Sequence, residues 1–323
     1  MNLIKFIQRI AIFFLLLNLQ AAFADSLRDR AAGPESAPQQ NGYVDNGAPS
    51  ANAVALPKDV QVLRDIAYGD DKQQRMDVYL PPLVADAPVI LMVHGGAWRG
   101  GDKSAASVVE NKVARWVPQG IIFISVNYRT LPKADPLQQA DDVARALAFA
   151  QSKAKSWGGN PAKFILIGYS AGAYLVDLLA ADPARALALG AHPWLATISL
   201  DSGALNVVQI MTGKHHDFFN AAFGNDPTYW KTASPFHILS TTATPMLLVC
   251  SATRPEKPCL QAHSFATKAT SLGIQTQVLE ESMSHEQINQ DLGLPGAYTA
   301  AVETYMSSLD ASLMRALGPA PCE

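Results

Sequence analysis

The sequence has little cysteine, little charge and no cationic excess. Three cysteines stand among 323 residues. They are too few for a fold built on disulfides, and none forms the C-x-x-C pair typical of zinc or redox sites. Charged residues make up 16% of the chain, and 25 Lys plus Arg against 28 Asp plus Glu give a net charge of −3. Nucleic-acid binders and polybasic membrane-surface proteins need a cationic field, so we expect neither a nucleic-acid partner nor electrostatic membrane attachment.

Long apolar runs are also scarce. One run, Ile10–Leu19, follows the basic residues Lys5 and Arg9 and precedes the small-residue site Ala22-Phe23-Ala24. It falls short of the roughly 20 residues that span a bilayer. A basic start, a short apolar stretch and an A-x-A site are typical of a cleaved secretory signal peptide. We therefore predict a signal peptide over residues 1–24, export to the periplasm or medium, and no stable membrane anchor after cleavage.

The rest of the chain divides into a polar leader and a folded domain. Residues 25–58 are rich in Ala, Pro, Gly, Ser, Asn and Gln, and cannot bury enough apolar surface to offset their chain entropy. We interpret them as a flexible leader. Hydrophobic residues make up 49% of the whole chain, which is ample for a core in the predicted domain over residues 59–323.

Short apolar runs alternate with helix-period segments along this domain. Such alternation predicts an α/β fold with a doubly wound, mostly parallel sheet and helices on both faces. Ligands of such sheets bind at the carboxyl ends of the strands. The expected strands are Gln74–Leu80, Pro88–Val93, Ile121–Tyr128, Phe164–Ile167, Leu195–Leu200, Met246–Cys250 and Gln275–Leu279, and the expected helices are Ser104–Trp116, Leu137–Ser156, Gly172–Ala181 and Cys259–Leu272.

A G-x-S-x-G sequence follows one of the central expected strands. Phe164–Ile167 runs directly into Gly168-Tyr169-Ser170-Ala171-Gly172, and a helical pattern comes next. This strand–turn–helix setting is typical of a nucleophile elbow, in which a strained turn raises the serine hydroxyl at a helix N-terminus. Ser170 is therefore the candidate nucleophile.

A second glycine-rich loop follows an earlier strand. The run ending at Val93 continues as His94-Gly95-Gly96-Ala97-Trp98, and loops of this type supply backbone N–H groups to an oxyanion. We predict an oxyanion hole formed by Gly96, Ala97 and Ala171. His94 is expected to organise the loop, and Trp98 either packs the core or lines an acyl pocket.

With both motifs in place, the chain resembles the α/β-hydrolase superfamily, in its carboxylesterase branch related to hormone-sensitive lipase and kynurenine formamidase. The resemblance extends from Asp65 to about Met306 and implies the α/β-hydrolase fold, a short cap insertion, acyl transfer to water, and no metal or organic cofactor. Besides the two loops, it rests on Tyr68-Gly69, Met76–Pro81, Val126–Arg129 and Gly158–Pro161.

The superfamily order of nucleophile, acid and then histidine predicts the general base. His285, in Ser284-His285-Glu286, follows the last expected strand and is the candidate. A histidine is needed because it accepts the serine proton and returns it near neutral pH. Another group, His215-His216-Asp217, could suggest a metal site, but adjacent histidines in a polar insertion are more often solvated, and we expect no metal.

The acid departs from the family pattern. The resemblance implies an Asp four residues beyond Cys250, but Arg254 stands there. Glu256, two residues later, is our preferred acid because its longer side chain offsets some of the displacement. Asp201, after the preceding strand, is the alternative, since some lipases carry their acid there. A weak or absent acid remains the third possibility.

The cysteines bear on this loop. Cys250 and Cys259 flank Glu256, and an exported protein folds where disulfides form. We therefore hypothesise a Cys250–Cys259 disulfide that holds the loop, with two reduced thiols as the alternative. Cys322 would stay unpaired.

A stretch between two strands, residues 204–244, is the expected cap insertion. Its aromatic residues either line a substrate pocket or pack the cap to the body, and we favour packing. The leading hypothesis is a serine carboxylesterase acting on a small-molecule ester. An arylformamidase-type amidase and a non-catalytic binding protein of the same fold are the alternatives. Neither the physiological substrate nor the oligomeric state can be read from the sequence.

Overall fold

The computed structural model describes residues 56–318. The predicted signal peptide over residues 1–24, nearly all of the leader over residues 25–58, and Cys322 lie outside these described residues. The described chain forms one sheet whose strands are β1 (Gln61–Ala67), β2 (Arg75–Leu80), β3 (Ala87–Val93), β4 (Ile122–Val126), β5 (Gly159–Tyr169), β6 (Ala196–Leu200), β7 (Met246–Ser251) and β8 (Thr276–Glu281).

The sheet is mostly parallel, as expected from the alternating sequence pattern. Its strand order is β1-β2-β4-β3-β5-β6-β7-β8. The pairs β1–β2 and β2–β4 are antiparallel, and every later pair is parallel. In the centre, Leu91 of β3 lies opposite Ile124 of β4 on one side and Leu166 of β5 on the other. The carboxyl ends of β5, β6 and β7 therefore meet at one edge, where ligands of such sheets bind.

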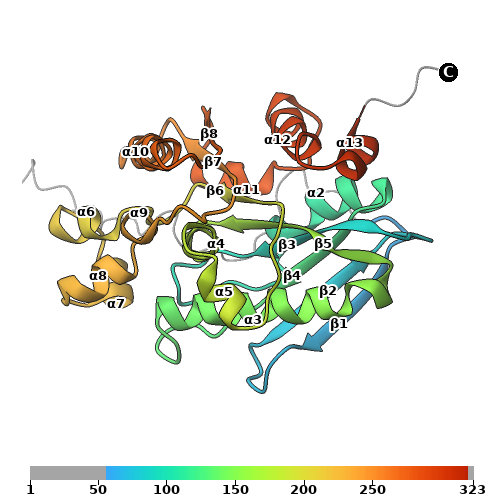
Figure 1. Cartoon of the computed structure of the whole chain (residues 1–323), viewed down its shortest axis with the longest axis horizontal. Coiled ribbons are helices and arrows are strands. Elements are labelled where there is room, and N and C mark those ends of the chain that lie inside the picture. The colour runs from blue at the N-terminus through green and yellow to red at the C-terminus, as the bar shows by residue number, and fades with distance from the viewer. Residues whose placement is uncertain (1–55, 319–323) are drawn as a thin grey trace, which may run out of the picture. The chain divides into compact units, whose positions relative to one another are not determined.

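Helices cover both faces of the sheet, so the predicted doubly wound architecture is confirmed (Figure 1). The helices α3, α4 and α10 pack on one face, and α2, α11, α12 and α13 pack on the other. Their bounds are α2 (Ala106–Trp116), α3 (Pro136–Lys153), α4 (Ala171–Ala181), α5 (Ala184–Ala188), α10 (Pro258–Ser271), α11 (His285–Gln290), α12 (Ala297–Ser307) and α13 (Ala311–Leu317), with short 3-10 turns at Val117–Gln119 and Ala154–Trp157.

Alternation along each central strand divides the core between the two faces. In β3, Val89, Leu91 and Val93 pack beneath α3 and α4, whereas Ile90 and Met92 pack beneath α2. Successive side chains of a strand point to opposite faces, so a strand covered on both sides must be apolar throughout. The near-continuous apolar runs in the sequence follow from this burial.

The segment between β6 and β7 forms the expected cap. It contains four short helices, α6 (Val207–Thr212), α7 (Asp217–Phe223), α8 (Pro227–Thr232) and α9 (Pro235–Ile238). They lie together next to α4, and α9 packs directly on it (Figure 1).

Several elements were not predicted from the sequence. These are the edge strand β1 and all of the described helices except α2, α3, α4 and α10. Among residues 56–318, no helix is both long enough and apolar enough to cross a membrane.

Candidate active site

Ser170 occupies the tight turn between β5 and α4. Its backbone adopts φ 55° and ψ −116°, a conformation that a non-glycine residue rarely takes. Gly172 permits this turn to approach the neighbouring strand. A Cβ on Gly172 would lie 2.3 Å from the carbonyl oxygens of Val93 and His94. The G-x-S-x-G spacing thus reflects close backbone packing, and it places Ser170 at the N-terminus of α4.

His285 lies within hydrogen-bond distance of Ser170. It is the first residue of α11, and Ser284 caps that helix by accepting the N–H of Gln287 in a capping box. The imidazole Nε2 is 2.9 Å from Ser170 Oγ, and Nδ1 is 2.5 Å from Asp201 Oδ2. The structure thus brings Ser170, His285 and Asp201 together in the arrangement of a Ser-His-Asp triad.

Asp201 stands at the carboxyl end of β6 in a second strained turn. Its φ is 49°, and its N–H donates to the carbonyl of Val249. The fully buried carboxylate accepts Ser251 N–H at 3.0 Å on Oδ1 and Arg254 Nη1 at 2.7 Å on Oδ2. Burial alone would raise the pKa of Asp201. The hydrogen bond and charge of His285, the charge of Arg254 and the Ser251 N–H outweigh it and hold that pKa below its ordinary value.

The preference for Glu256 as the acid is wrong in this structure. The Nδ1 side of His285 is already occupied by Asp201 and Arg254. Glu256 lies beyond the guanidinium, 3.5 Å from Arg254 Nε and 3.3 Å from His216 Nε2, and its side chain is 37% exposed. The alternative acid, Asp201, reaches His285 because β6 ends next to β5, which carries the nucleophile.

The predicted oxyanion loop lies against the nucleophile. A Cβ on Gly95 would be 3.0 Å from the Cβ of Ser170. Gly96 and Ala97 both have positive φ, 120° and 50°, and a Cβ on Gly96 would lie 2.2 Å from the carbonyl oxygen of Gly100. Ala171, the first residue of α4, has an N–H without an acceptor inside its helix, as at every helix start.

His94 holds this loop through contacts with Gly95 and Tyr128. Its Nδ1 is 2.7 Å from the carbonyl oxygen of Gly95, and its ring stacks on Tyr128 with the ring centroids 4.6 Å apart. The Tyr128 hydroxyl donates to the His94 carbonyl. Both contacts involve buried groups, in keeping with the expected structural role of His94.

Trp98 and the cap aromatics form one packed cluster. The buried Trp98 ring contacts Tyr174 of α4 and Phe219 and Phe223 of the cap, with centroid separations of 5.1–5.8 Å. The favoured role of the cap aromatics, packing the cap to the body, matches this cluster. Trp98 contributes to the same contact.

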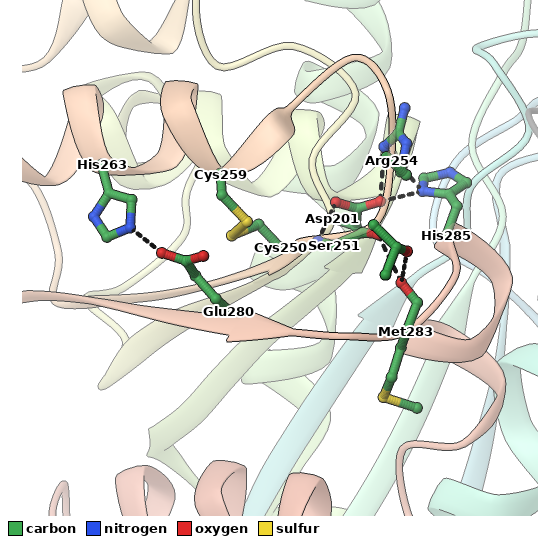
Figure 2. The surroundings of a disulfide bond; sticks show 10 residues. Asp201, Cys250, Ser251, Arg254, Cys259, His263, Glu280, Met283 and His285 are labelled. Atoms are coloured by element: carbon green, nitrogen blue, oxygen red, sulfur yellow. Dashed lines mark hydrogen bonds and ion pairs between the residues drawn. A yellow bond between two sulfur atoms is a disulfide. The ribbon is translucent and has the colours of Figure 1, made fainter.

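A disulfide closes the loop that carries Arg254. Cys250, in β7, is bonded to Cys259, in α10. Figure 2 shows the loop between them rising over Asp201, so that Arg254 reaches both Asp201 and His285. The structure therefore contains the hypothesised bond, and the bond anchors both ends of this loop.

A cavity of about 550 Å³ is lined by Arg254 and by Ser202 and Gly203, which follow Asp201, but by none of the three triad residues. Leu205, Phe219 and Val249 give it an apolar wall, and Arg254 with the cap residue His216 gives it a polar one. Such a cavity, apolar with a few polar groups, suits a small organic ligand.

The structure gives the His215-His216-Asp217 group other partners than a metal. His215 Nε2 is 2.9 Å from Asn220 Oδ1, and His216 faces Glu256. Within residues 56–318, no group of three His, Cys, Asp or Glu side chains is placed to hold a metal ion.

Arg254 is the site residue whose role sequence reasoning missed. The signal was present: an arginine at the family's acid position implies a carboxylate partner close by. Its contact with Asp201, a residue 53 positions away, depends on how β6 and β7 pair and is visible only in three dimensions.

Comparisons with known proteins find similar sequences among proteins named as esterases. The BD-FAE family model matches residues 76–190. A probable isoprenylcysteine alpha-carbonyl methylesterase of Oryza sativa is 32% identical over 116 residues, which are 36% of this chain and 27% of that protein. The esterase LipQ of Mycobacterium tuberculosis is 27% identical over 228 residues, which are 66% of this chain and 53% of LipQ. The chain thus spans about a quarter to a half of these relatives.

Solved structures share the fold at low sequence identity. A truncated carbohydrate esterase from gut microbiota aligns with a TM-score of 0.67 and 16% identity, covering 79% of this chain and 99% of that one. Esterase B from Lactobacillus Rhamnosis aligns with a TM-score of 0.65 and 17% identity, covering 93% and 95%. With the sheet order, the elbow and the glycine-rich loop, these findings show that the chain has the α/β-hydrolase fold.

Proposed function

We propose that the chain is a serine hydrolase that cleaves carboxylic esters through an acyl-enzyme intermediate. The observation that carries the proposal is the continuous contact from Ser170 Oγ through the His285 imidazole to the buried carboxylate of Asp201, at 2.9 and 2.5 Å. Relatives named as esterases and carboxylic ester hydrolases favour an ester over another acyl substrate.

Each residue has one task in this reaction. His285 accepts the Ser170 proton as the hydroxyl oxygen attacks the ester carbonyl, and then gives that proton to the leaving alcohol. Asp201 keeps the Nδ1 proton of His285 directed toward itself and stabilises the imidazolium. Gly96, Ala97 and Ala171 donate backbone N–H groups to the oxyanion. Water then attacks the acyl-enzyme, with His285 acting as base again, and no metal or organic cofactor takes part.

Export belongs to the same proposal. The N-terminal pattern over residues 1–24 is typical of a signal peptide, and a Cys250–Cys259 disulfide suits an oxidising compartment. We therefore place the enzyme in the periplasm or outside the cell. Mass spectrometry of the mature N-terminus tests this, because cleavage after Ala24 is expected and an intact N-terminus would contradict it.

The activity is tested with the purified protein on short-chain p-nitrophenyl esters. Wild type should hydrolyse them. Ser170→Ala should lower kcat by about 10⁴-fold or more, because the nucleophile is lost. Wild-type protein that shows only the Ser170→Ala rate on every ester tried would refute the proposal.

A matched pair of variants tests the assignment of the acid. Asp201→Asn keeps the shape of the carboxylate but not its charge, and should lower kcat by about 10⁴-fold. Glu256→Gln makes the same change one loop away and should keep kcat within about tenfold, since Glu256 touches Arg254 rather than His285. The opposite ranking of the two variants would restore Glu256 as the acid.

A further inference from the structure

Arg254 places a cation against both the acid and the base of the triad. Its Nη1 donates to Asp201 Oδ2 at 2.7 Å and lies 3.3 Å from His285 Nδ1 (Figure 2). The same carboxylate oxygen faces His285 Nδ1 at 2.5 Å. One oxygen of Asp201 is thus shared between the guanidinium and the imidazole.

This sharing has two electrostatic consequences of the same sign. The guanidinium neutralises part of the Asp201 charge that stabilises a protonated His285. It also repels the positive charge that His285 acquires on protonation. Both effects disfavour the imidazolium, and both are strong because Asp201 is fully buried and the Arg254 side chain is only 12% exposed.

Other charged or titratable groups surround His285 on the elements packed against it. None of them pairs with the acid as Arg254 does in the contacts described here. Glu256 sits on the outer side of Arg254 and offsets part of its charge from 3.5 Å. The remaining groups on these elements are Tyr169 on β5, whose ring centroid lies 4.8 Å from that of His285, and Lys112 on α2, Glu286 on α11 itself and Tyr298 on α12, whose described hydrogen bonds go to other residues.

We propose that Arg254 is a positioning residue that shares the Asp201 carboxylate with His285 and so extends the esterase reaction toward acid pH. It acts through Asp201 and His285 and needs no contact with substrate. The proposal rests on the proposed triad. An arginine can stand at the family's acid position in this chain because the acid, Asp201, follows β6 instead. Arg254 then pairs with that carboxylate.

The test is the pH profile of kcat/KM, whose acid limb reports the essential base of the free enzyme. Arg254→Gln keeps a hydrogen-bond donor for Asp201 but removes the charge. It should move the acid limb up by about one to two pH units. Arg254→Lys keeps the charge and should hold the limb within about 0.3 unit of wild type.

Arg185→Gln is the matched control. It removes another arginine paired with an aspartate, Asp141 at 2.7 Å, on α5 away from the triad. Its acid limb should coincide with that of wild type. An unmoved limb in Arg254→Gln, even with uniformly lower activity, would reduce Arg254 to a structural contact. Equal shifts in Arg254→Gln and Arg254→Lys would show that geometry rather than charge is responsible. Either result overturns the proposal.

Nuclear magnetic resonance titration of the His285 ring separates this proposal from the proposed function. In Arg254→Gln the ring should take up its proton at higher pH than in wild type, whether or not any ester is hydrolysed. A wild-type protein inactive on all esters would refute the proposed function alone. An unchanged His285 titration in Arg254→Gln would refute the role of Arg254 alone.

Discussion

At the scale of single residues, strained backbone and buried polar side chains occur together at the carboxyl ends of β5 and β6. Ser170 and Asp201 both have positive φ although neither is glycine. Each such backbone costs about 1–3 kcal/mol and persists only where surrounding contacts enforce it. Here the Ser170 N–H donates to Leu200 and the Asp201 N–H donates to Val249, so each turn is held by the next strand of the sheet.

A second buried acid, Asp177, lies on α4, the helix that begins directly after the nucleophile. Burial raises its pKa to about 7, against the opposing hydrogen bonds of Ser202 and Ser199. In the unfolded chain an Asp titrates near 3.9. The folded state therefore binds a proton that the unfolded state releases between about pH 4 and 7, and stability falls as pH rises through that window.

Asp177→Asn removes this dependence, because an amide does not titrate. The Tm of Asp177→Asn should exceed that of wild type by about 3–6 °C more at pH 8 than at pH 4. Calorimetric scans at both pH values measure the difference. The exposed Asp86, whose pKa is lowered by the hydrogen bond from Lys163, is the control. Asp86→Asn should give a small change of opposite sign, and a pH-independent gain in Asp177→Asn would contradict the assignment.

At the scale of elements, the loop from β7 to α10 depends on the Cys250–Cys259 disulfide. The cross-link joins residues nine positions apart. Restricting the unfolded chain in this way contributes about 2–3 kcal/mol in the loop-entropy model. The same bond limits how far Arg254 can move from Asp201.

Replacing both cysteines tests this contribution. Cys250→Ser with Cys259→Ser should lower the free energy of unfolding by about 2–3 kcal/mol in urea titrations. It should also move the acid limb of the kcat/KM profile toward that of Arg254→Gln, since the loop that holds Arg254 on Asp201 becomes looser. Reduced wild type should match the double variant, while the variant itself should not respond to reductant. A reductant-sensitive variant or an unchanged midpoint would contradict this role.

The elements differ in how far the sequence predicts them. Strands β2 to β8 were expected because most are apolar runs buried by their neighbours. The edge strand β1 was missed since Gln61–Ala67 is largely exposed and carries Arg64 and Asp65, which break the apolar pattern. The elbow and the glycine loop were predictable because their backbone geometry demands particular residues at fixed spacing.

The acid was not predictable for a different reason. Glu256 and Asp201 both follow a strand that ends at the site edge, and sequence spacing does not say which side chain reaches His285. The choice is made by tertiary packing: β6 lies next to β5, and Arg254 fills the space on the β7 side. Local pattern thus predicts the residue types of the site, and strand neighbourhood decides their partners.

At the scale of the whole molecule, the triad brings together residues that are far apart in the sequence and that lie on elements packed on opposite faces of the sheet. Ser170 and His285 are 115 positions apart, and His285 arrives on α11, which belongs to the core beneath α2. The buried Lys112 of α2 ties these elements together. Its ammonium donates to the carbonyl of Asn289 at 2.5 Å, at the far end of α11.

Lys112→Met should therefore affect stability and catalysis together. Losing a charged donor leaves the buried Asn289 carbonyl without that bond, at a cost of about 1–3 kcal/mol in the free energy of unfolding. Because α11 carries the base, we expect kcat to fall by about tenfold or more with little change in KM. Urea titration and steady-state kinetics on the same preparation measure both.

Lys268→Met is the matched control, since Lys268 donates to the Phe236 carbonyl at 2.5 Å in the cap. It should lose stability but keep its kcat. Equal loss of kcat in both variants would mean that general destabilisation, rather than the seating of α11, accounts for the effect.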